Sequence, residues 1–295
     1  MSPLNNIIIF FITIVYAKHH LSIILLSAPK KIPMLTYTID YFLNAYNYNR
    51  GDIIIDGFFM GKGCDCEHVE LYDVMNKLKN NGIPTYDVQL NKDVLYDDSE
   101  FMKKFYDFYS SAWNDNHQYY YEMIDHSYMK ILITVTNFFH QLIDEMERIT
   151  PKYEYILFLE DDVAFQKDFF VKLSEEMKKT YDDELLMKLA YYIDYKIPDT
   201  HWKLPRDGCV WGFWGMLYNR EQLKQYKTFG KYQNFLLTGD LYHCEMYRMF
   251  NQSIRMVEIA YHFGRDKEIN PRDKRFWMKQ RTKSKRQKIF EIKIG

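Results

Sequence analysis

Residues 153–163, which read YEYILFLEDDV, decide the fold and mark the first candidate site. The four apolar or aromatic residues at 156–159 are typical of a strand that is buried on both faces, as in a parallel sheet covered by helices. The strand is followed by Glu160, Asp161 and Asp162, at the sheet edge where such folds bind ligands. Because neighbouring carboxylates repel one another unless a cation neutralises them, the stretch indicates a site for Mg²⁺, Mn²⁺ or Ca²⁺ rather than zinc.

The same acids have a plainer interpretation. Residues 165–181 are predicted to form a helix, and Asp161 or Asp162 would then cap its first turn. This stretch alone does not separate a helix cap from a metal site, so the choice depends on the rest of the chain.

Strands and helices alternate on both sides of this stretch. We predict strands at residues 21–26, 52–59, 83–90, 185–195 and 255–262. We predict helices at residues 33–44, 66–79, 131–146, 220–227 and 240–250, the second with Val69, Tyr72, Val74 and Leu78 on its inner face. Successive β-then-α units indicate parallel pairing, so the fold class is α/β: a mostly parallel, Rossmann-like sheet flanked by helices in a single domain.

The two ends of the chain differ from its body. Residues 7–17 form an apolar run of eleven residues, short of the ~18–20 that span a bilayer. We assign residues 1–17 to a signal peptide or short signal anchor, with a buried first strand as the alternative, and residues 18–271 to the folded domain. The tail, residues 272–295, holds ten of the 39 Lys and Arg residues but two of the 40 acids. A basic tail on a mildly acidic body argues against nucleic-acid binding and leaves membrane association open.

The four cysteines, an even number, favour a protein of the secretory lumen. Cys64 and Cys66 are too close to pair easily with each other, so disulfides to the two later cysteines are more plausible. Together with His68 they also resemble half of a zinc site, but no second close pair completes it. A glycosylation sequon at Asn251 agrees with a lumenal chain.

Several common catalytic motifs fail in this sequence. Residues 57–63, GFFMGKG, are one residue short of a phosphate-binding loop, and Gly63 stands where Ser or Thr would bind magnesium. The sequence has no G-x-G-x-x-G, H-E-x-x-H or G-x-S-x-G. Dehydrogenase and hydrolase functions therefore lose their usual support.

An apolar strand that ends in clustered acids suits a nucleotide-sugar transferase. Such an enzyme needs a divalent ion to neutralise the departing nucleoside diphosphate. It also needs a separate carboxylate to take the proton from the acceptor hydroxyl. Asp240, which follows Gly239 and opens a predicted helix, is the candidate base, although a helix N-cap is the alternative for this residue.

Four regions of the sequence, in order, resemble one enzyme family. They are the strand and loop at 23–31, YILFLEDDV at 155–163, WGFWGMLY at 211–218, and GDL at 239–241 with YHFG at 261–264. Together they resemble the GT-A glycosyltransferases of the N-acetylglucosaminyltransferase IV family, which add β1,4-linked GlcNAc to the mannose arm of N-glycans. The resemblance covers about residues 21–265 and implies a GT-A-like sheet.

The resemblance implies roles for the acids of the central stretch. Asp162 would ligate the metal with Asp161 beside it, while Glu160 and Asp161 would orient the metal and the ribose diphosphate. His262 would be a further metal ligand or a hydrogen-bond donor to the diphosphate, unless it is an ordinary core histidine.

The resemblance also implies roles for residues outside that stretch. Asp240 would be the catalytic base. Ser27, in the loop at 27–31, would line the uridine, and Lys130 would reach a phosphate. Trp211 and Trp214 would stack on the acceptor sugar, unless they belong to the core.

The function implied is an inverting transfer of GlcNAc from UDP-GlcNAc to a glycan or glycoprotein, with Mn²⁺ or Mg²⁺ as cofactor. The expected location is the Golgi or ER lumen, or outside the cell. Collagen-type galactosyltransferases and the GalNAc transferase of GPI anchors share similar acid triplets, so another UDP-sugar donor stays open. A secreted glycan-binding protein without catalysis and a structural protein are further alternatives.

Overall fold

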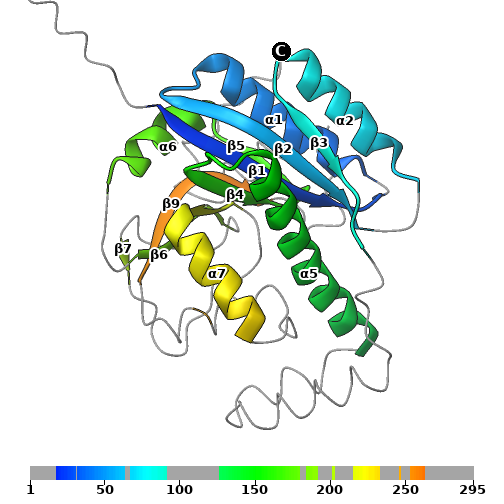
Figure 1. Ribbon diagram of the computed structural model, residues 1–295. Coiled ribbons are helices and arrows are strands. Elements are labelled where there is room, and N and C mark those ends of the chain that lie inside the picture. Colours follow the sequence, from blue (N-terminus) through cyan, green and yellow to red (C-terminus); the bar gives the residue numbers. More distant parts are fainter. Residues whose placement is uncertain are drawn as a thin grey trace, which may run out of the picture.

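The structure is a computed structural model that describes residues 18–30, 32–63, 67–91, 126–179, 184–191, 201–202, 215–232, 246 and 253–262. Within them, nine strands form one sheet with the order β3-β2-β1-β4-β8-β6-β9-β5, and β7 pairs with β9 (Figure 1). The strands are β1 (His19–Ser27), β2 (Ile53–Lys62), β3 (Thr85–Val88), β4 (Tyr155–Leu159), β5 (Val163–Phe165), β6 (Glu184–Tyr191), β7 (His201–Trp202), β8 (Met216–Asn219) and β9 (Ser253–His262). The helices are α1 (Met34–Tyr48), α2 (Val69–Asn80), α5 (His126–Ile149), α6 (Phe169–Met177) and α7 (Arg220–Tyr232).

The predicted mostly parallel sheet is confirmed. Strands β3, β2, β1 and β4 are parallel neighbours. β8 runs antiparallel to β4 and to β6, so β6 and its parallel partner β9 point the same way as β4. β5 and β7 are antiparallel to β9. The parallel strands therefore bring their carboxyl ends to one edge of the sheet.

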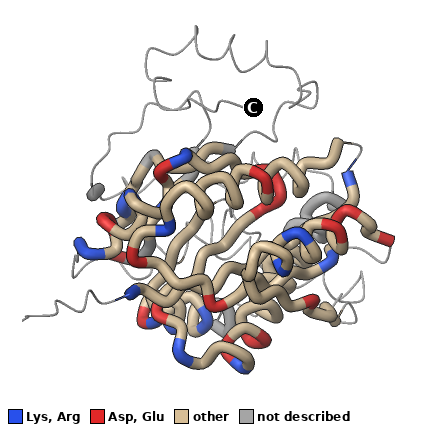
Figure 2. The backbone as a smooth tube through the Cα atoms, turned by 90° about the horizontal axis from the view of Figure 1, so that it is seen from above, with Lys and Arg blue, Asp and Glu red and all other residues tan. Residues whose placement is uncertain are grey.

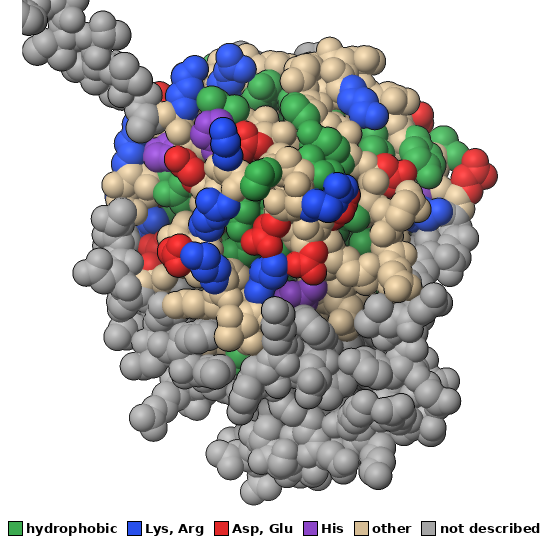
Figure 3. Space-filling model, in the orientation of Figure 1, with side chains coloured by type: hydrophobic (Ala, Val, Ile, Leu, Met, Phe, Trp, Pro, Cys, Tyr) green, Lys and Arg blue, Asp and Glu red, His purple; other side chains and the backbone are tan. Residues whose placement is uncertain are grey.

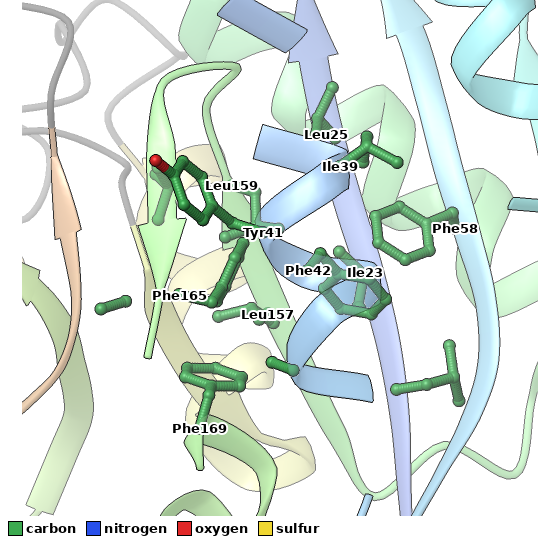
Figure 4. Packing of buried hydrophobic residues seen from close by; sticks show 14 of the residues in the cluster. Ile23, Leu25, Ile39, Tyr41, Phe42, Phe58, Leu157, Leu159, Phe165 and Phe169 are labelled. Carbon is green, nitrogen blue, oxygen red and sulfur yellow. The ribbon is translucent and has the colours of Figure 1, made fainter. Parts of the chain in front are cut away.

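Helices cover both faces of the sheet. On one face α1, α2 and α6 enclose a hydrophobic cluster to which β1, β2 and β4 contribute alternate residues, among them Ile23, Phe58 and Leu157 (Figure 4). On the other face α5 and α7 pack on the sheet, and Phe158 lies between Phe139 and Tyr226. Because successive strand residues point to opposite faces, residues 156–159 of β4 are all fully buried, as the apolar run predicts.

Two predictions about helices are wrong. Val69 and Tyr72 are exposed, at 57% and 46%, because the buried face of α2 is formed at helical spacing by Leu71, Val74, Met75 and Leu78. The helix predicted from residue 165 begins at Phe169, because residues 163–165 instead form β5 and pair with β9. The residue that precedes this helix is Asp168, so neither Asp161 nor Asp162 caps it.

The glycines of residues 57–63 do not form a phosphate loop. They lie within and directly after β2, which continues through Gly57 and Gly61 with a shift of its register against β1 just before Gly57. A Cβ atom on Gly57 would stand 2.6 Å from the ring of Tyr86, and one on Gly61 would stand 2.8 Å from Leu90. These glycines therefore allow close packing against their neighbours, and the rejection of a phosphate loop holds.

The described part of the face shown in Figure 3 carries no large patch of one charge. Lys and Arg residues and Asp and Glu residues are both scattered along the tube in Figure 2, and side chains of both signs are interspersed on the described part of the face shown in Figure 3. Among the described residues, no helix has the length and apolar character needed to cross a membrane. The predicted signal segment, the four cysteines, the sequon and the basic tail lie outside the described residues.

Candidate functional site

The two aspartates lie in a tight turn between two strands. β4 ends at Leu159, the turn holds Asp161 and Asp162, and β5 starts at Val163. Asp161 is 4% exposed and Asp162 is 6% exposed, whereas Glu160 is half-buried. Burying two adjacent carboxylates is costly unless each has a charged or hydrogen-bonding partner. The two aspartates of the turn therefore need partners from neighbouring elements.

The end of β1 supplies partners for Asp161. β1 is the parallel neighbour of β4, with Leu25 opposite Leu159, so the residues that follow both strands meet at the same edge. The Ser27 hydroxyl donates a hydrogen bond to Asp161 Oδ2 at 2.9 Å. The Lys30 ammonium donates to Asp161 Oδ1 and lies 3.6 Å from Asp162 Oδ2. One lysine thus stands between two buried carboxylates.

His68 extends this network from the loop before α2. Its Nε2 atom lies 2.9 Å from Ser27 Oγ, and its side chain is buried. Because the hydroxyl hydrogen of Ser27 goes to Asp161, Nε2 of His68 carries a hydrogen and donates it to Ser27 Oγ. In a hydrolytic triad the histidine would instead accept the hydrogen of the serine. The chain His68–Ser27–Asp161 therefore positions a carboxylate and does not activate a nucleophile.

The turn is also held from the side of α1. The backbone N–H of Val163 donates to Thr38 Oγ1 at 3.0 Å, and Thr38 is fully buried. This bond satisfies a backbone donor directly after the aspartates and fixes the turn to the helix that follows β1. The acids are thus positioned by β1, α1, β4 and β5 together.

The pKa values of the charged groups reflect their mutual attraction. Burial by itself would lower the pKa of Lys30, but Asp161, Asp162 and Glu160 outweigh it, so the pKa is raised. Burial raises the pKa of Asp161, and the neighbouring charge of Asp162 raises it further, while Lys30 and Ser27 act in the opposite direction. The net effect is a raised pKa for Asp161, and the nearby Lys30 ammonium keeps this rise smaller than burial alone would make it.

The structure brings part of the predicted site together. Ser27, Asp161 and Asp162 are in one network, and Glu160 directly precedes it. His262 ends β9 and is the register partner of Val163, so its backbone lies beside the aspartate turn, although its side chain is not described.

The remaining predicted residues are not placed in this network. Lys130 is in α5, and its side chain is not described. Trp211, Trp214 and Asp240 lie outside the described residues. Their predicted roles stay predictions.

The carboxylates have the ligand chemistry that a divalent cation requires. Within the part of the chain that is described, no group of three or more His, Cys, Asp and Glu side chains is arranged to hold a metal ion. Asp161 and Asp162 nevertheless offer the hard oxygen ligands that Mg²⁺ and Mn²⁺ prefer, and a positive group already lies between them. Asp161 and Asp162 are thus the residues that would hold the ion.

Comparison with known proteins yields structural similarity alone. No protein-family model and no curated protein matches the chain. A glycosyltransferase involved in the glycosylation of the major capsid of PBCV-1 is similar over 83% of this chain and 93% of its own, with 8% identity and a TM-score of 0.39. Mouse xyloside xylosyltransferase 1 is similar over 86% of this chain and 100% of its own, with 11% identity and a TM-score of 0.40.

A third similar structure has a different description. It is 4-diphosphocytidyl-2C-methyl-D-erythritol synthase from Anaerococcus prevotii, which covers 84% of this chain and 91% of its own, with 10% identity and a TM-score of 0.39. Scores this low carry no argument about function, and none of these three structures points to the N-acetylglucosaminyltransferase IV family.

The position of His68 predicts a loss of stability in mild acid. Burial lowers the pKa of His68, and Lys62 lowers it further against the opposing effect of Glu70. The unfolded chain therefore binds the proton at a higher pH than the folded chain, so the free energy of unfolding falls as the pH drops below about 6.5. We expect a contribution of up to about 1.4 kcal/mol per pH unit, measured by urea unfolding between pH 7 and pH 5.

The His68→Gln variant is the control for this effect. Glutamine keeps an N–H donor for Ser27 but does not titrate, so the pH dependence of its unfolding should be shallower than that of the wild type. Identical pH dependence in the two proteins would show that another group is responsible.

Proposed function

We propose that this protein is a metal-dependent nucleotide-sugar transferase whose donor site is the edge of the sheet at Asp161 and Asp162. The observation that supports this best is the meeting of two buried aspartates after β4 with a serine and a lysine after β1. Carboxylates and a cationic side chain at the carboxyl ends of parallel strands suit a diphosphate that arrives with a divalent cation.

The reaction breaks the bond between the anomeric carbon of the sugar and the β-phosphate oxygen. The acceptor hydroxyl forms the new bond to the anomeric carbon, its proton passes to a base, and the nucleoside diphosphate leaves with the bonding electrons. The ion, when bound, neutralises the negative charge of the departing diphosphate. Asp161 and Asp162 would hold the ion, Ser27 would keep Asp161 oriented, and Lys30 would add positive charge beside the leaving group.

The narrower assignment comes from the sequence resemblance. We propose UDP-GlcNAc as the donor and the mannose arm of an N-glycan as the acceptor, with a secretory-pathway location. Trp211 and Trp214 are the proposed acceptor contacts, and Lys130 and His262 are proposed to approach the diphosphate. Membrane association would come from the apolar segment at residues 7–17 or from the basic tail.

A donor screen tests the proposal. The purified protein is incubated with UDP-GlcNAc, UDP-galactose or UDP-GalNAc and a mixture of N-glycans, with Mn²⁺ or with EDTA, and UDP release is measured. We expect release that depends on Mn²⁺ and is fastest with UDP-GlcNAc. Faster release with another donor would correct the sugar. Calorimetry that detects no Mn²⁺-dependent binding of UDP would reject the transferase and favour a glycan-binding protein.

Asp240 is the proposed catalytic base, and its removal should separate turnover from binding. The Asp240→Asn variant is expected to lose about 100- to 10,000-fold in kcat, because a positioned base contributes that much to a proton transfer. The affinity of the variant for UDP in the presence of Mn²⁺, measured by calorimetry, should stay within about twofold of the wild type. Full activity in this variant would show that another residue takes the proton.

A further inference from the structure

Lys30 has the position that a metal ion would take between the two aspartates. Its ammonium donates a hydrogen bond to Asp161 Oδ1 and lies 3.6 Å from Asp162 Oδ2. We propose that Lys30 is a built-in counter-ion of this carboxylate pair, that a divalent cation must displace it, and that the displaced ammonium then binds the diphosphate of the donor. This proposal rests on the proposed function and adds a coupling between metal and nucleotide.

The burial of the aspartates explains why a counter-ion is needed. Asp161 and Asp162 have side-chain exposures of 6% and 8%, so water screens their repulsion poorly. By contrast, Lys172 pairs at 3.0 Å with Asp168, whose side chain is 45% exposed and can be solvated without help. The two lysines are similarly exposed, at 41% and 37%, so the difference lies in the carboxylates.

The side chain of Lys30 is suited to move while the rest of the network stays. It is 41% exposed and has a flexible four-carbon stem, so its ammonium can leave the aspartates without entering the core. Ser27 is held from the opposite side by His68 and keeps its bond to Asp161 Oδ2. When an ion takes over the charge of the aspartates, Lys30 loses its partners and gains most from an anionic ligand beside them.

The expected consequence is cooperative binding. Without nucleotide, Mn²⁺ has to displace Lys30 and binds weakly. With UDP present, the displaced ammonium has a new partner, so each ligand should increase the affinity for the other by the same factor. Removal of the Lys30 charge should therefore strengthen the binding of Mn²⁺ alone and weaken its coupling to UDP.

The test measures binding of Mn²⁺ by calorimetry, with and without UDP, in the wild type and in the Lys30→Met variant. We expect the variant to bind Mn²⁺ alone about tenfold or more tightly than the wild type and to show a smaller increase in affinity when UDP is added. The matched control is Lys62→Met, which removes the same charge from the end of β2, opposite Ser27 in the sheet register. The control distinguishes the loss of a direct partner of the aspartates from a general change in local charge. Its affinity for Mn²⁺ should stay within about threefold of the wild type.

Each outcome bears on the proposal. Equal Mn²⁺ affinity in the wild type and Lys30→Met, or an equal increase in Lys62→Met, overturns the role of Lys30 and leaves the proposed transferase untouched. Binding of Mn²⁺ by Lys30→Met but not by the wild type, even with UDP, supports the counter-ion and rejects the metal dependence of the transferase. Absence of Mn²⁺ binding in both proteins overturns both.

The Lys30→Arg variant keeps the test decisive if Lys30→Met does not fold. Arginine retains the charge and pairs with a carboxylate through two parallel hydrogen bonds, so it should be harder to displace. We expect Mn²⁺ alone to bind Lys30→Arg more weakly than the wild type. Tighter binding would contradict displacement of the residue by the ion.

Discussion

The Asp162→Asn variant is expected to lose about 100-fold or more in kcat/KM for Mn²⁺-dependent sugar transfer. Asparagine has nearly the same shape as aspartate but lacks the negative charge that would hold the cation at the leaving diphosphate. Loss of one preorganised electrostatic contact to a developing charge commonly costs this much. Asp162 gives a cleaner test than Asp161, because Asp161 also receives the hydrogen bonds from Ser27 and Lys30 that hold the site together.

The measurement is UDP release at saturating Mn²⁺, with thermal unfolding to show that the variant is folded. Asp168→Asn is the matched control, because it makes the same change at a half-exposed aspartate that pairs with Lys172. Its activity should stay within about twofold of the wild type. Retention of activity in Asp162→Asn, with the control also active, would mean that Asp162 serves the fold and not the reaction.

Local patterns were sufficient to predict the centre of the sheet. Residues 156–159 are four apolar residues in a row, and each is fully buried because helices cover both faces of β4. The strands at β1 and β2 are predicted from runs that are mostly apolar or β-branched, interrupted by Ser22 and Asp56. The strand at β9 is predicted from alternation along residues 255–262. A strand that is covered on both faces needs apolar residues on both, so it is visible in the sequence as a continuous apolar run.

Elements that depend on distant partners were not predictable in this way. The segment at 163–165 is short and apolar, and by its sequence it could begin a helix. It forms β5 instead, because Ala164 pairs with Tyr261, which is far away along the chain. On α2, Val69 and Tyr72 are apolar enough to be placed inside. The spacing of Leu71, Val74 and Leu78 defines the buried face instead, and it leaves Tyr72 outside.

Only part of the site is predictable from the sequence, because its residues come from loops that are far apart along the chain. Asp161 and Asp162 are conspicuous after an apolar strand, and Ser27 was placed near them through the family resemblance. The sequence places Lys30 in the same loop but indicates no partner for it, and it offers His68 only as part of half a zinc site. The available signal was topological: both residues follow strands of the parallel sheet, so both reach its carboxyl edge.

The Phe42→Ala variant is expected to reduce the free energy of unfolding by about 3–5 kcal/mol. Phe42 is fully buried, and its ring makes edge-to-face contacts with Phe58 of β2, Phe165 of β5 and Phe170 of α6, at centroid distances of 4.8, 5.6 and 5.2 Å. Figure 4 shows Phe42 with Phe58 and Phe165. Truncation to alanine removes these contacts and leaves a cavity that four elements border. The loss is large against the ~5–15 kcal/mol that stabilises a typical domain, and urea unfolding measures it.

Tyr72→Ala is the control, and it also tests the corrected face of α2. Tyr72 is 46% exposed, so its truncation should change the free energy of unfolding by about 0.5 kcal/mol or less. A large loss in Tyr72→Ala would mean that this tyrosine belongs to the core after all. A loss below about 1 kcal/mol in Phe42→Ala would mean that the cluster around α1 closes over the missing ring.

The same variant should also affect the site, because α1 connects the core to the aspartate turn. Thr38 is one helical turn before Phe42 and lies on the same face, where its Oγ1 accepts the bond from the Val163 N–H. If the loss of the Phe42 ring lets α1 shift, that bond weakens and Asp162 loses its fixed position. We therefore expect Phe42→Ala to bind Mn²⁺ and UDP more weakly at temperatures where it is still folded, whereas Tyr72→Ala should bind them like the wild type. Unchanged binding in a destabilised Phe42→Ala protein would show that β1 and β4 hold the aspartates without help from α1.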